Sequence, residues 1–219
     1  MNQESVWRRK SNDFIESKLG ECKYGKILDI GCGKKKWKSG QNHTVVIGVD
    51  NQNHEGVDFV CDVNQKLPFE SKSFDFALMN NFLEHTLEPK EVLQHTHRVL
   101  KDEGTLLITV PFLVKVHQAP VDFYRYTPFA ITQLLVQSGF RVEEVESLTN
   151  IQDTFRLHAK TFLKIAMRET PSRWRRYLLY RIVNLIMSLL CLTFRISSGT
   201  NSFSTIYTLG FGIRCKKMG

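Results

Sequence analysis

The stretch KILDIGCG, residues 26–33, joins a compact apolar run to a loop with two glycines. Four more short apolar runs follow, each bounded by Gly, Pro, Asn or Asp: HTVVIGVD (43–50), VDFVCD (57–62), SFDFALMN (73–80) and GTLLITVP (104–111). Such runs are typical of buried parallel strands. Before the last of them, PKEVLQHTHRVLKDEG has helical spacing, with proline in the first turn and glycine at the exit. The alternation predicts an α/β fold with a mostly parallel sheet.

Further elements are predicted on either side of this pattern. Thr127 is a suitable N-cap and Pro128 a suitable first residue for a helix that runs to about Ser138. The other expected elements are a short helix over 5–19, a strand with one exposed face at 140–147 and a last strand at 205–215.

Length and composition set the domain organisation. A chain of 219 residues suffices for one well-buried domain but not for two full ones. The 42% apolar and 24% charged content is ordinary for a globular protein and excludes wholesale disorder. We therefore expect a single domain over 1–219, with a core at about 20–150 and 205–215 and a helical, basic insertion at about 151–204.

The cysteines and the first residues bear on the compartment. The five cysteines are scattered and form no C-x-x-C pair, so a disulfide framework or a zinc ribbon is not expected. A reducing compartment fits this usage. The N-terminal residues MNQESVWRRKSNDF lack the apolar centre of a secretory signal. The expected location is therefore cytoplasmic.

The net charge of +8 is unevenly distributed. Residues 1–150 hold 18 Lys/Arg and 20 Asp/Glu, whereas residues 151–219 hold 12 Lys/Arg and only two acids. Such asymmetry suggests contact with an anionic partner, which can be a membrane face, a nucleic acid or a phosphorylated substrate. A solvated basic face is the alternative interpretation.

The glycine loop and two later acids predict a nucleoside site. Ligands of open α/β sheets bind beyond the carboxyl ends of the strands, where Gly31 and Gly33 lie. The loop is not a dinucleotide fingerprint, because Lys36 occupies the third glycine position, and no P-loop motif is present. Asp50 at the end of the second run can accept hydrogen bonds from ribose hydroxyls. Asp62 can accept from the exocyclic amine of a base.

At this point a family resemblance emerges. The runs ILDIGCG, GVD, CDVNQKLPFESKSFDFALMNNFLEH and RVLKDEGTLLITVPF resemble class I S-adenosylmethionine-dependent methyltransferases of the small type 11 kind. The resemblance covers about residues 25–142. The run HQAPVDFYRYTPFAITQLLVQSGF is similar to a subgroup linked to polysaccharide or glycolipid assembly. The resemblance implies a Rossmann-like three-layer sandwich, a mostly parallel sheet with an antiparallel last strand, and here a helical C-terminal insertion.

The resemblance also implies roles for individual residues. S-adenosylmethionine would be the cofactor and S-adenosylhomocysteine its product, with no metal expected. Lys35 stands where the family often has a further glycine. The implied cofactor residues are Asp29, Gly31, Cys32 and Gly33 around the methionine, Asp50 at the ribose, Asp62 and the Val63 backbone at the adenine, and Asn80 beside the amine and sulfonium.

Residues after the fourth and fifth runs are candidates for chemistry. A base is needed only if the methyl acceptor loses a proton. His117 is the preferred base, with Asp122 to orient it, and His85 is either a second base or a structural residue. Tyr124 and Arg125 are candidate substrate contacts. The alternative is that the aromatic ring packs the loop and the arginine pairs with a local acid.

The insertion contains a basic stripe and an apolar run. Arg156, Lys160, Lys164 and Arg168 recur every four residues, and YLLYRIVNLIMSLLCLTF follows at 177–194. A membrane span there would separate the last strand from its sheet. An interfacial helix on an anionic membrane, and a helix buried on the domain or at a dimer contact, remain alternatives.

Together these features predict a methyltransferase that uses S-adenosylmethionine. The expected acceptor is a small molecule, a sugar or a lipid-linked glycan. The protein is expected to be cytoplasmic, and either soluble or peripheral on the inner face of the membrane. Two other functions remain open. One is an RNA methyltransferase, suggested by the basic segment, and the other is a cofactor-binding scaffold without catalysis.

Overall fold

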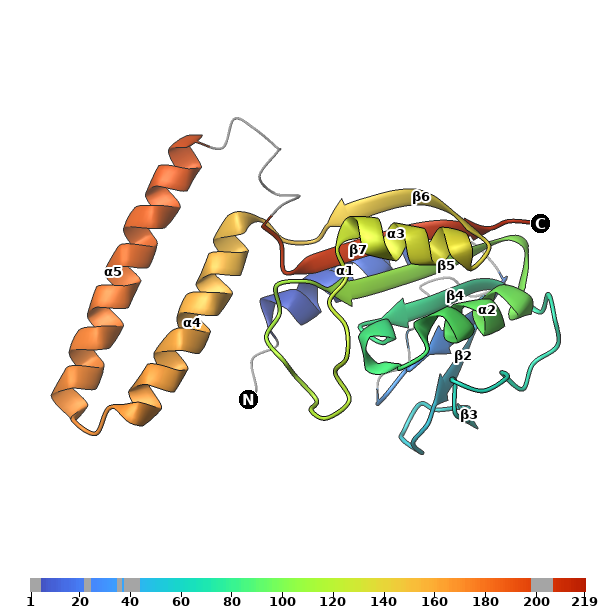
Figure 1. Ribbon diagram of the computed structural model, residues 1–219, viewed down its shortest axis with the longest axis horizontal. Helices are drawn as coiled ribbons and strands as arrows, with labels where there is room; N and C mark the ends of the chain where they lie inside the picture. Colours follow the sequence, from blue (N-terminus) through green and yellow to red (C-terminus); the bar gives the residue numbers. More distant parts are fainter. Residues whose placement is uncertain (1–4, 22–24, 35–36, 38–43, 198–206) are drawn as a thin grey trace. The chain divides into compact units, whose positions relative to one another are not determined.

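The computed structural model describes residues 5–21, 25–34, 37, 44–197 and 207–219. The chain forms two compact units: a core unit made of Met1–Leu148 and Gly210–Gly219, and a helical unit made of Thr149–Leu209. Lys35 and Lys36, singled out above, lie outside the described residues. The elements of the core unit, shown in Figure 1, are α1 (Val6–Leu19), β1 (Gly25–Ile30), β2 (Thr44–Asp50), β3 (Phe59–Val60), β4 (Phe74–Asn80), η1 (Leu83–His85), α2 (Pro89–Val99), β5 (Leu100–Pro111), α3 (Pro128–Gln137), β6 (Phe140–Ser147) and β7 (Gly210–Lys217).

One seven-stranded sheet organises the core unit, in the order β3-β2-β1-β4-β5-β7-β6. β1 to β5 pair in parallel, and β7 runs antiparallel between β5 and β6. The expected α/β class and the antiparallel last strand are confirmed. Since β1 lies between β2 and β4, the ends of these three strands, with the loops that follow them, meet at one edge of the sheet.

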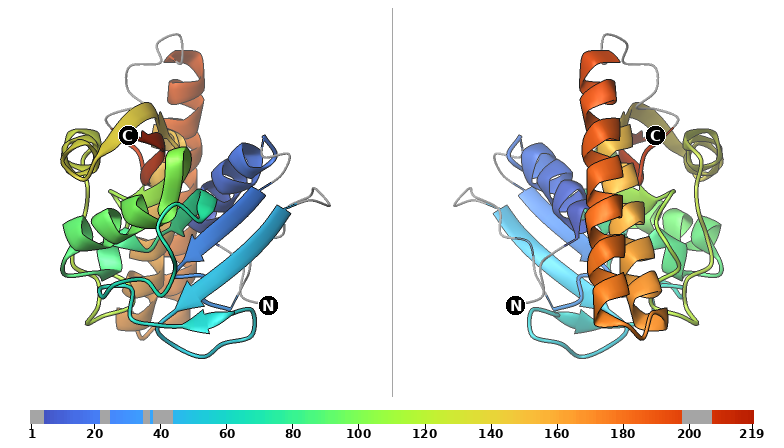
Figure 2. Two further views of the ribbon diagram at one scale, coloured as in Figure 1. Left: turned by 90° about the vertical axis from the view of Figure 1, so that its right-hand side faces the viewer. Right: turned by 90° about the vertical axis from the view of Figure 1, so that its left-hand side faces the viewer.

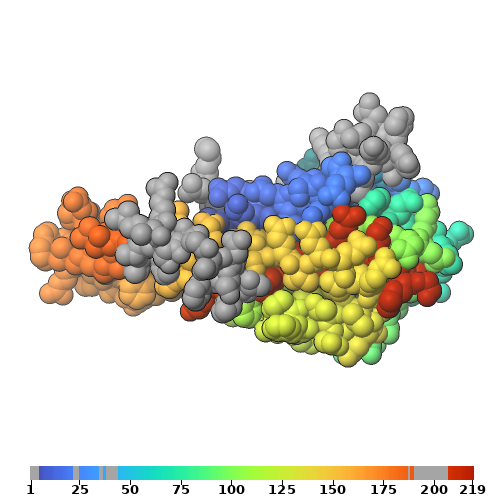
Figure 3. Space-filling view, turned by 90° about the horizontal axis from the view of Figure 1, so that it is seen from above, coloured from blue at the N-terminus to red at the C-terminus, as the bar shows by residue number. Residues whose placement is uncertain are grey.

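Helices cover both faces of this sheet. α1 contacts β4, β5 and β7, whereas α2 contacts β5 and α3 contacts β6. Figures 1 and 2 show α1 on one face and α2 with α3 on the other, and Figure 3 shows α1 and α3 on opposite sides of β6. The core between these layers is apolar, with Leu28, Leu93 and Ile108 fully buried. Thr127 caps α3 as predicted, because its side chain accepts from the Ala130 amide.

Three strand boundaries differ from the prediction. β5 begins at Leu100 instead of Gly104, because Leu100 is fully buried and pairs with Phe74 at the start of β4. β3 is reduced to two exposed residues at the sheet edge. β7 spans Gly210–Lys217 instead of 205–215, and the Lys217 ammonium donates to the Leu100 carbonyl at 2.8 Å. Polar residues therefore extend this strand beyond its apolar run.

The helical unit lies in sequence between β6 and β7. It consists of α4 (Ile151–Glu169) and α5 (Arg173–Ser197), which pack side by side. Asn150 begins α4 by accepting from the Asp153 amide at 2.9 Å. Among the described residues, no helix has both the length and the apolar character that crossing a membrane requires.

Candidate functional site

The glycine loop after β1 is shaped by two left-handed glycines. Gly31 has φ of 71°, and a Cβ built there would lie 2.1 Å from Cδ2 of Phe82. The aromatic ring after β4 therefore packs directly on the glycine backbone. Gly33 has φ of 57°, but a Cβ there would meet no atom within 4 Å. Gly31 lets the loop pack against the segment that follows β4. Gly33 borders open space that a ligand can enter.

The acid at the end of β2 already interacts with this loop. The Asp50 carboxylate accepts from the Gly33 amide at 2.9 Å and from the Gln52 amide at 3.1 Å. It therefore lies beside the open side of the loop, where the sequence analysis expects a ribose. Asp62 is exposed, and its Oδ1 accepts from the backbone and side-chain amides of Asn64. The neighbouring Val63 side chain is buried, so its backbone is held by the core.

Cys32 and Asp29 are buried in this loop. Burial, followed by the charges of Asp29 and Asp50, raises the pKa of the Cys32 thiol to about 12. The thiol therefore stays protonated at neutral pH and is no nucleophile. This state fits a residue that contributes its backbone. Asp29 is 1% exposed and pairs in register with Gly48 and Leu78 on the neighbouring strands.

Asn80 connects β4 to the N-terminal helix. Its Nδ2 donates to Oδ1 of Asn12 at 2.9 Å, and its Oδ1 accepts from the Thr109 hydroxyl at 2.6 Å. The next residue, Asn81, donates from its side chain to the Ser11 hydroxyl at 2.9 Å. α1 thus contributes polar groups at the carboxyl ends of β4 and β5. Sequence reasoning missed this contribution because nothing in the helix pattern distinguishes these two polar residues.

A second cluster follows β4 and β5. It unites His85 from η1 with His117 and Asp122 from the loop between β5 and α3, as the sequence analysis expected. The two imidazole rings lie edge to face with centroids 5.1 Å apart. Between them is Glu84, which is fully buried. Its Oε1 lies 3.7 Å from Nε2 of His85 and 3.7 Å from Nε2 of His117.

Both nitrogens of each histidine ring lie near polar groups. Nδ1 of His117 lies 3.2 Å from Asp122 and 3.3 Å from the Lys115 carbonyl, and Nδ1 of His85 contacts the Val121 carbonyl. Nδ1 of His117 also lies 3.4 Å from Nη2 of Arg125, which can only donate, so these contacts do not fix a single tautomer of that ring. Nε2 of both rings faces the Glu84 carboxylate. Nε2 of His85 also lies 3.1 Å from the Gln118 amide nitrogen.

The acids around His117 favour its protonated form. The Glu84 carboxylate and then the Asp122 charge raise the pKa of His117, against the opposing effect of partial burial. The Arg125 guanidinium, followed by the His117 backbone amide at 2.7 Å, holds the pKa of Asp122 well below its usual range. Asp122 is therefore always ionised at neutral pH. Acids on two sides of His117 therefore stabilise its charged form.

Arg125 closes the loop that holds this cluster. Its guanidinium forms a double interaction with Asp122 at 2.6 and 2.8 Å. It also donates to the carbonyls of Val114, Lys115 and Tyr124. The alternative in which the arginine pairs with a local acid is thus the one seen. Its expected role as a substrate clamp becomes a positioning role, because its donors are used within the loop.

Tyr124 lies at the outer side of the same loop. Its hydroxyl donates to the Leu87 carbonyl at 3.0 Å, and its ring stacks on Tyr126 with centroids 5.7 Å apart. The side chain keeps about a third of its surface exposed, at 36%. It therefore packs the loop and still presents a face to solvent.

Glu84 was missed from the sequence, although it directly precedes His85. A carboxylate in a loop is usually solvated, and only the fold reveals its complete burial. Within the described residues, neither of its oxygens has a hydrogen-bond partner. The nearest ligand atoms of Glu84, His85 and His117 all lie within 4.8 Å of one another. The three side chains are thus close enough to share one proton or one cation.

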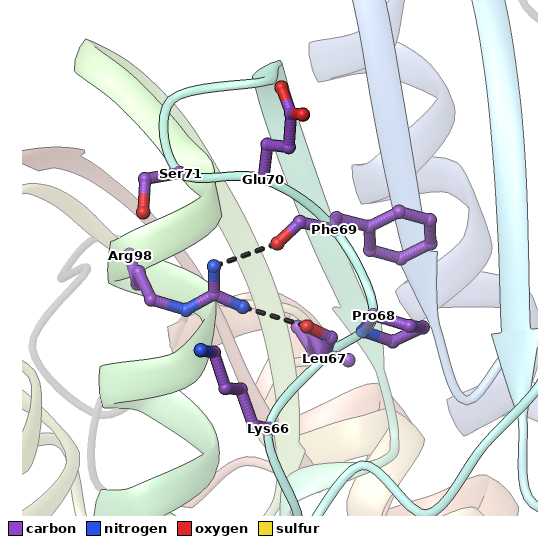
Figure 4. A pocket seen from close by; sticks show the side chains of 7 residues that line it. All are labelled: Lys66, Leu67, Pro68, Phe69, Glu70, Ser71 and Arg98. Atoms are coloured by element: carbon purple, nitrogen blue, oxygen red, sulfur yellow. Dashed lines mark hydrogen bonds between the residues drawn. The ribbon is translucent and has the colours of Figure 1, made fainter.

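Another hollow of the core unit lies away from this cluster. It measures about 550 Å³ and is lined by residues 66–71 and Arg98 (Figure 4). The Arg98 guanidinium donates to the carbonyls of Leu67 and Phe69, both at 2.7 Å. The hollow lies near the start of β4, because its lining residues precede that strand and the Ser73 amide donates to the Val99 carbonyl at the end of α2. The Arg98 hydrogen bonds hold the segment that leads into β4. The glycine loop lies at the opposite end of the strands.

Comparisons with known proteins agree with this geometry. A family model described as a methyltransferase domain matches residues 6–145. An uncharacterized protein of Methanocaldococcus jannaschii is 28% identical over 135 residues, which cover 53% of this chain and 65% of that protein. A demethylmenaquinone methyltransferase of Staphylococcus aureus is 26% identical over 187 residues, which cover 76% of this chain and 74% of the relative.

A solved structure shows the same fold. The Burkholderia thailandensis 1,6-didemethyltoxoflavin-N1-methyltransferase, with its substrate and S-adenosylhomocysteine bound, aligns with a TM-score of 0.58 at 17% identity. The alignment covers 99% of this chain and 80% of that one. The family match extends over more than half of the sequence, and the sheet order and glycine loop accord with it. The chain therefore belongs to the methyltransferase domain family, among the class I S-adenosylmethionine-dependent methyltransferases.

Proposed function

We propose that the protein transfers a methyl group from S-adenosylmethionine to a hydroxyl of a small molecule, a sugar or a lipid-linked glycan. The observation that carries the proposal is the position of His117 between the acids Glu84 and Asp122, after the carboxyl end of β5. A hydroxyl must lose a proton when it is methylated, and this ring is built to accept one.

The glycine loop suits the cofactor. The open side of Gly33 gives room for a ligand, and the left-handed backbone of Gly31 and Gly33 lets main-chain groups approach it closely. Asp50 would hold the ribose hydroxyls, and Asp62 with the Val63 backbone the adenine. Asp29 and Cys32 would shape the methionine end, with Asn80 beside its amine. When bound, S-adenosylmethionine supplies a methyl group activated by the attached sulfonium.

The protein's own groups then handle the proton. As the acceptor hydroxyl takes up the methyl group that the cofactor would supply, its proton would pass to the imidazole of His117. Asp122 holds the Nδ1 side of the ring, and Glu84 stabilises the imidazolium that results. His85 completes the wall of the site through its contacts with Gln118 and the Val121 carbonyl. Tyr124 would contact the acceptor, whereas Arg125 keeps Asp122 in place.

The choice of acceptor rests on resemblance. The loop HQAPVDFYRY is similar to that of methyltransferases linked to polysaccharide and glycolipid assembly. Two of the proteins named above, the demethylmenaquinone methyltransferase and the 1,6-didemethyltoxoflavin-N1-methyltransferase, have small-molecule acceptors in their names. We treat the helical unit as an insertion into a single methyltransferase domain.

The test has two stages. Isothermal titration with S-adenosylhomocysteine, with NAD as control ligand, examines the cofactor site first, and micromolar binding of the former alone is expected. Methyl incorporation is then measured on glycan, lipid and RNA fractions. Incorporation into the glycan or lipid fraction supports the proposal. Incorporation into RNA alone would replace it, and binding without any turnover would indicate a scaffold.

A further inference from the structure

An exposed apolar stripe runs along α5. Its members recur at intervals of three or four residues, which places them on one face of the helix. Their exposed fractions range from 42% for Leu178 to 69% for Trp174. The stripe consists of Trp174, Leu178, Ile182, Leu185 and Leu189. A contiguous exposed apolar surface of this kind marks a site of interaction.

The stripe is not the face that packs on α4. Val183 and Ile186 line a hollow of about 320 Å³ with Phe155 and Phe162 of α4. At ~100° per residue, Val183 lies roughly 140° and Ile186 roughly 80° around the helix from the middle of the stripe. The packing of the hairpin therefore leaves the stripe uncovered within the helical unit.

The charge of α5 is of one sign. Its 25 residues include five arginines and neither aspartate nor glutamate. Arg175 and Arg181 flank the stripe, each about 60° from its middle on opposite sides. The Arg181 guanidinium lies over the Tyr177 ring at 5.8 Å and donates to the Tyr177 hydroxyl. Long cationic side chains thus border the apolar surface on both sides, and an aromatic ring borders it on the side of Arg181.

The apolar stripe with its flanking arginines fits one kind of partner. If two copies paired through the stripe, they would bring their arginines together with no acid on the helix to neutralise them. An anionic lipid surface satisfies both features, because acyl chains accept the stripe and phosphate groups attract the arginines. Tryptophan and tyrosine favour this same boundary between acyl chains and headgroups.

We propose that α5 lies in the plane of an anionic membrane surface, with the stripe among the acyl chains and Arg175 and Arg181 at the lipid phosphates. The binding itself does not depend on methyl transfer. Its consequence, that a lipid-linked acceptor is met at this surface, rests on the proposed function.

The first test is binding of the full-length protein to vesicles. We expect flotation with vesicles that contain phosphatidylglycerol and little with pure phosphatidylcholine. Replacing Arg175 and Arg181 by glutamine should weaken binding roughly 30-fold, since one arginine near an anionic surface contributes a factor of about five. Replacing Leu178 and Leu185 by glutamine should abolish binding. Ile165→Gln, an exposed apolar position on α4, is the matched control and should bind as the parent does.

A spectroscopic measurement locates the contact. Trp7 and Trp37 are buried, whereas Trp174 is exposed, so a blue shift of emission on anionic vesicles reports Trp174. Trp174→Phe should remove the shift. Equal binding to both vesicle types, or no binding by a folded protein, would overturn the proposal. A dimer that the leucine variant dissociates would assign the stripe to a second copy. Titration with S-adenosylhomocysteine in parallel tests the cofactor site separately.

Discussion

The proposed cofactor side and the proposed acceptor side of the core unit are built by different means. The glycine loop after β1 uses backbone shape, with Gly31 packed under Phe82 and the Gly33 amide bound to Asp50. The cluster after β4 and β5 uses side chains, with a buried carboxylate between two histidines. Backbone shape serves one fixed ligand well. Side-chain clusters can be adjusted one residue at a time, which suits the part of an enzyme that meets a variable acceptor.

The largest effect is expected on the side-chain half. His117→Ala should lower turnover by about 10²–10⁴-fold, because the acceptor proton loses its destination. Affinity for S-adenosylhomocysteine should be unchanged, and isothermal titration measures it. His158→Ala, on the exposed surface of α4, serves as the control. Full turnover in the His117 variant would leave that residue a structural role and break the division between the two halves.

Substitutions in the glycine loop should change the stability of the fold. Gly31→Ala should lower the free energy of unfolding by roughly 2–5 kcal/mol, since it combines a left-handed φ with a clash on Phe82. Gly33→Ala shares the left-handed φ but meets open space, so about 1–2 kcal/mol is expected. Urea denaturation compares the two. Equal losses would show that Phe82 moves aside easily and that the packing on Gly31 is not rigid.

Asp50 and Asp62 are expected to contribute differently to the affinity for S-adenosylhomocysteine. Asp50→Ala should weaken S-adenosylhomocysteine binding roughly 10–100-fold, the usual range for charge-assisted hydrogen bonds. Asp62→Ala should cost about 10-fold or less, because a single contact to the base is at stake. Titration of folded variants decides between them. Unchanged affinity in the Asp50 variant would remove the ribose assignment.

A smaller effect, on the pH dependence of turnover, tests the role of Glu84. His117 must be neutral to accept a proton, so turnover should rise with pH through its raised pKa. Glu84→Gln removes the largest cause of the raised His117 pKa and should move the profile to lower pH. The pairing also stabilises the fold below the ordinary histidine pKa of 6.5, and this stabilisation is lost as pH rises through the folded pKa. A profile that stays in place would show that Glu84 does not act on His117.

The sequence predicted the regular part of this molecule well. The strands with apolar runs and glycine or aspartate ends were all located, because burial in a parallel sheet requires just that composition. The last strand was placed too early. Thr208 and Leu209 belong to the helical unit, where the Leu209 amide donates to the Thr149 hydroxyl. An apolar run alone does not reveal where a chain leaves one unit and enters the next.

The candidate site was only partly predictable. Asp50 lies beside the glycine loop as its position after a strand suggested, and His117, His85 and Asp122 come together as expected. The burial of Glu84 and the involvement of Ser11 and Asn12 required the fold. These residues carry no local signal, because their environment is created by segments distant in sequence.

The hydrogen bonds of Arg125 within its own loop bear on how the loop tolerates substitution. Since this side chain binds Asp122 and three carbonyls of its own loop, the loop holds its shape from within. Its outward-facing residues Val116, Val121 and Phe123 are exposed. Under the proposed function, substitutions at these positions should alter which molecule is accepted while the position of His117 stays fixed. The proposed base would then serve new acceptors without being rebuilt.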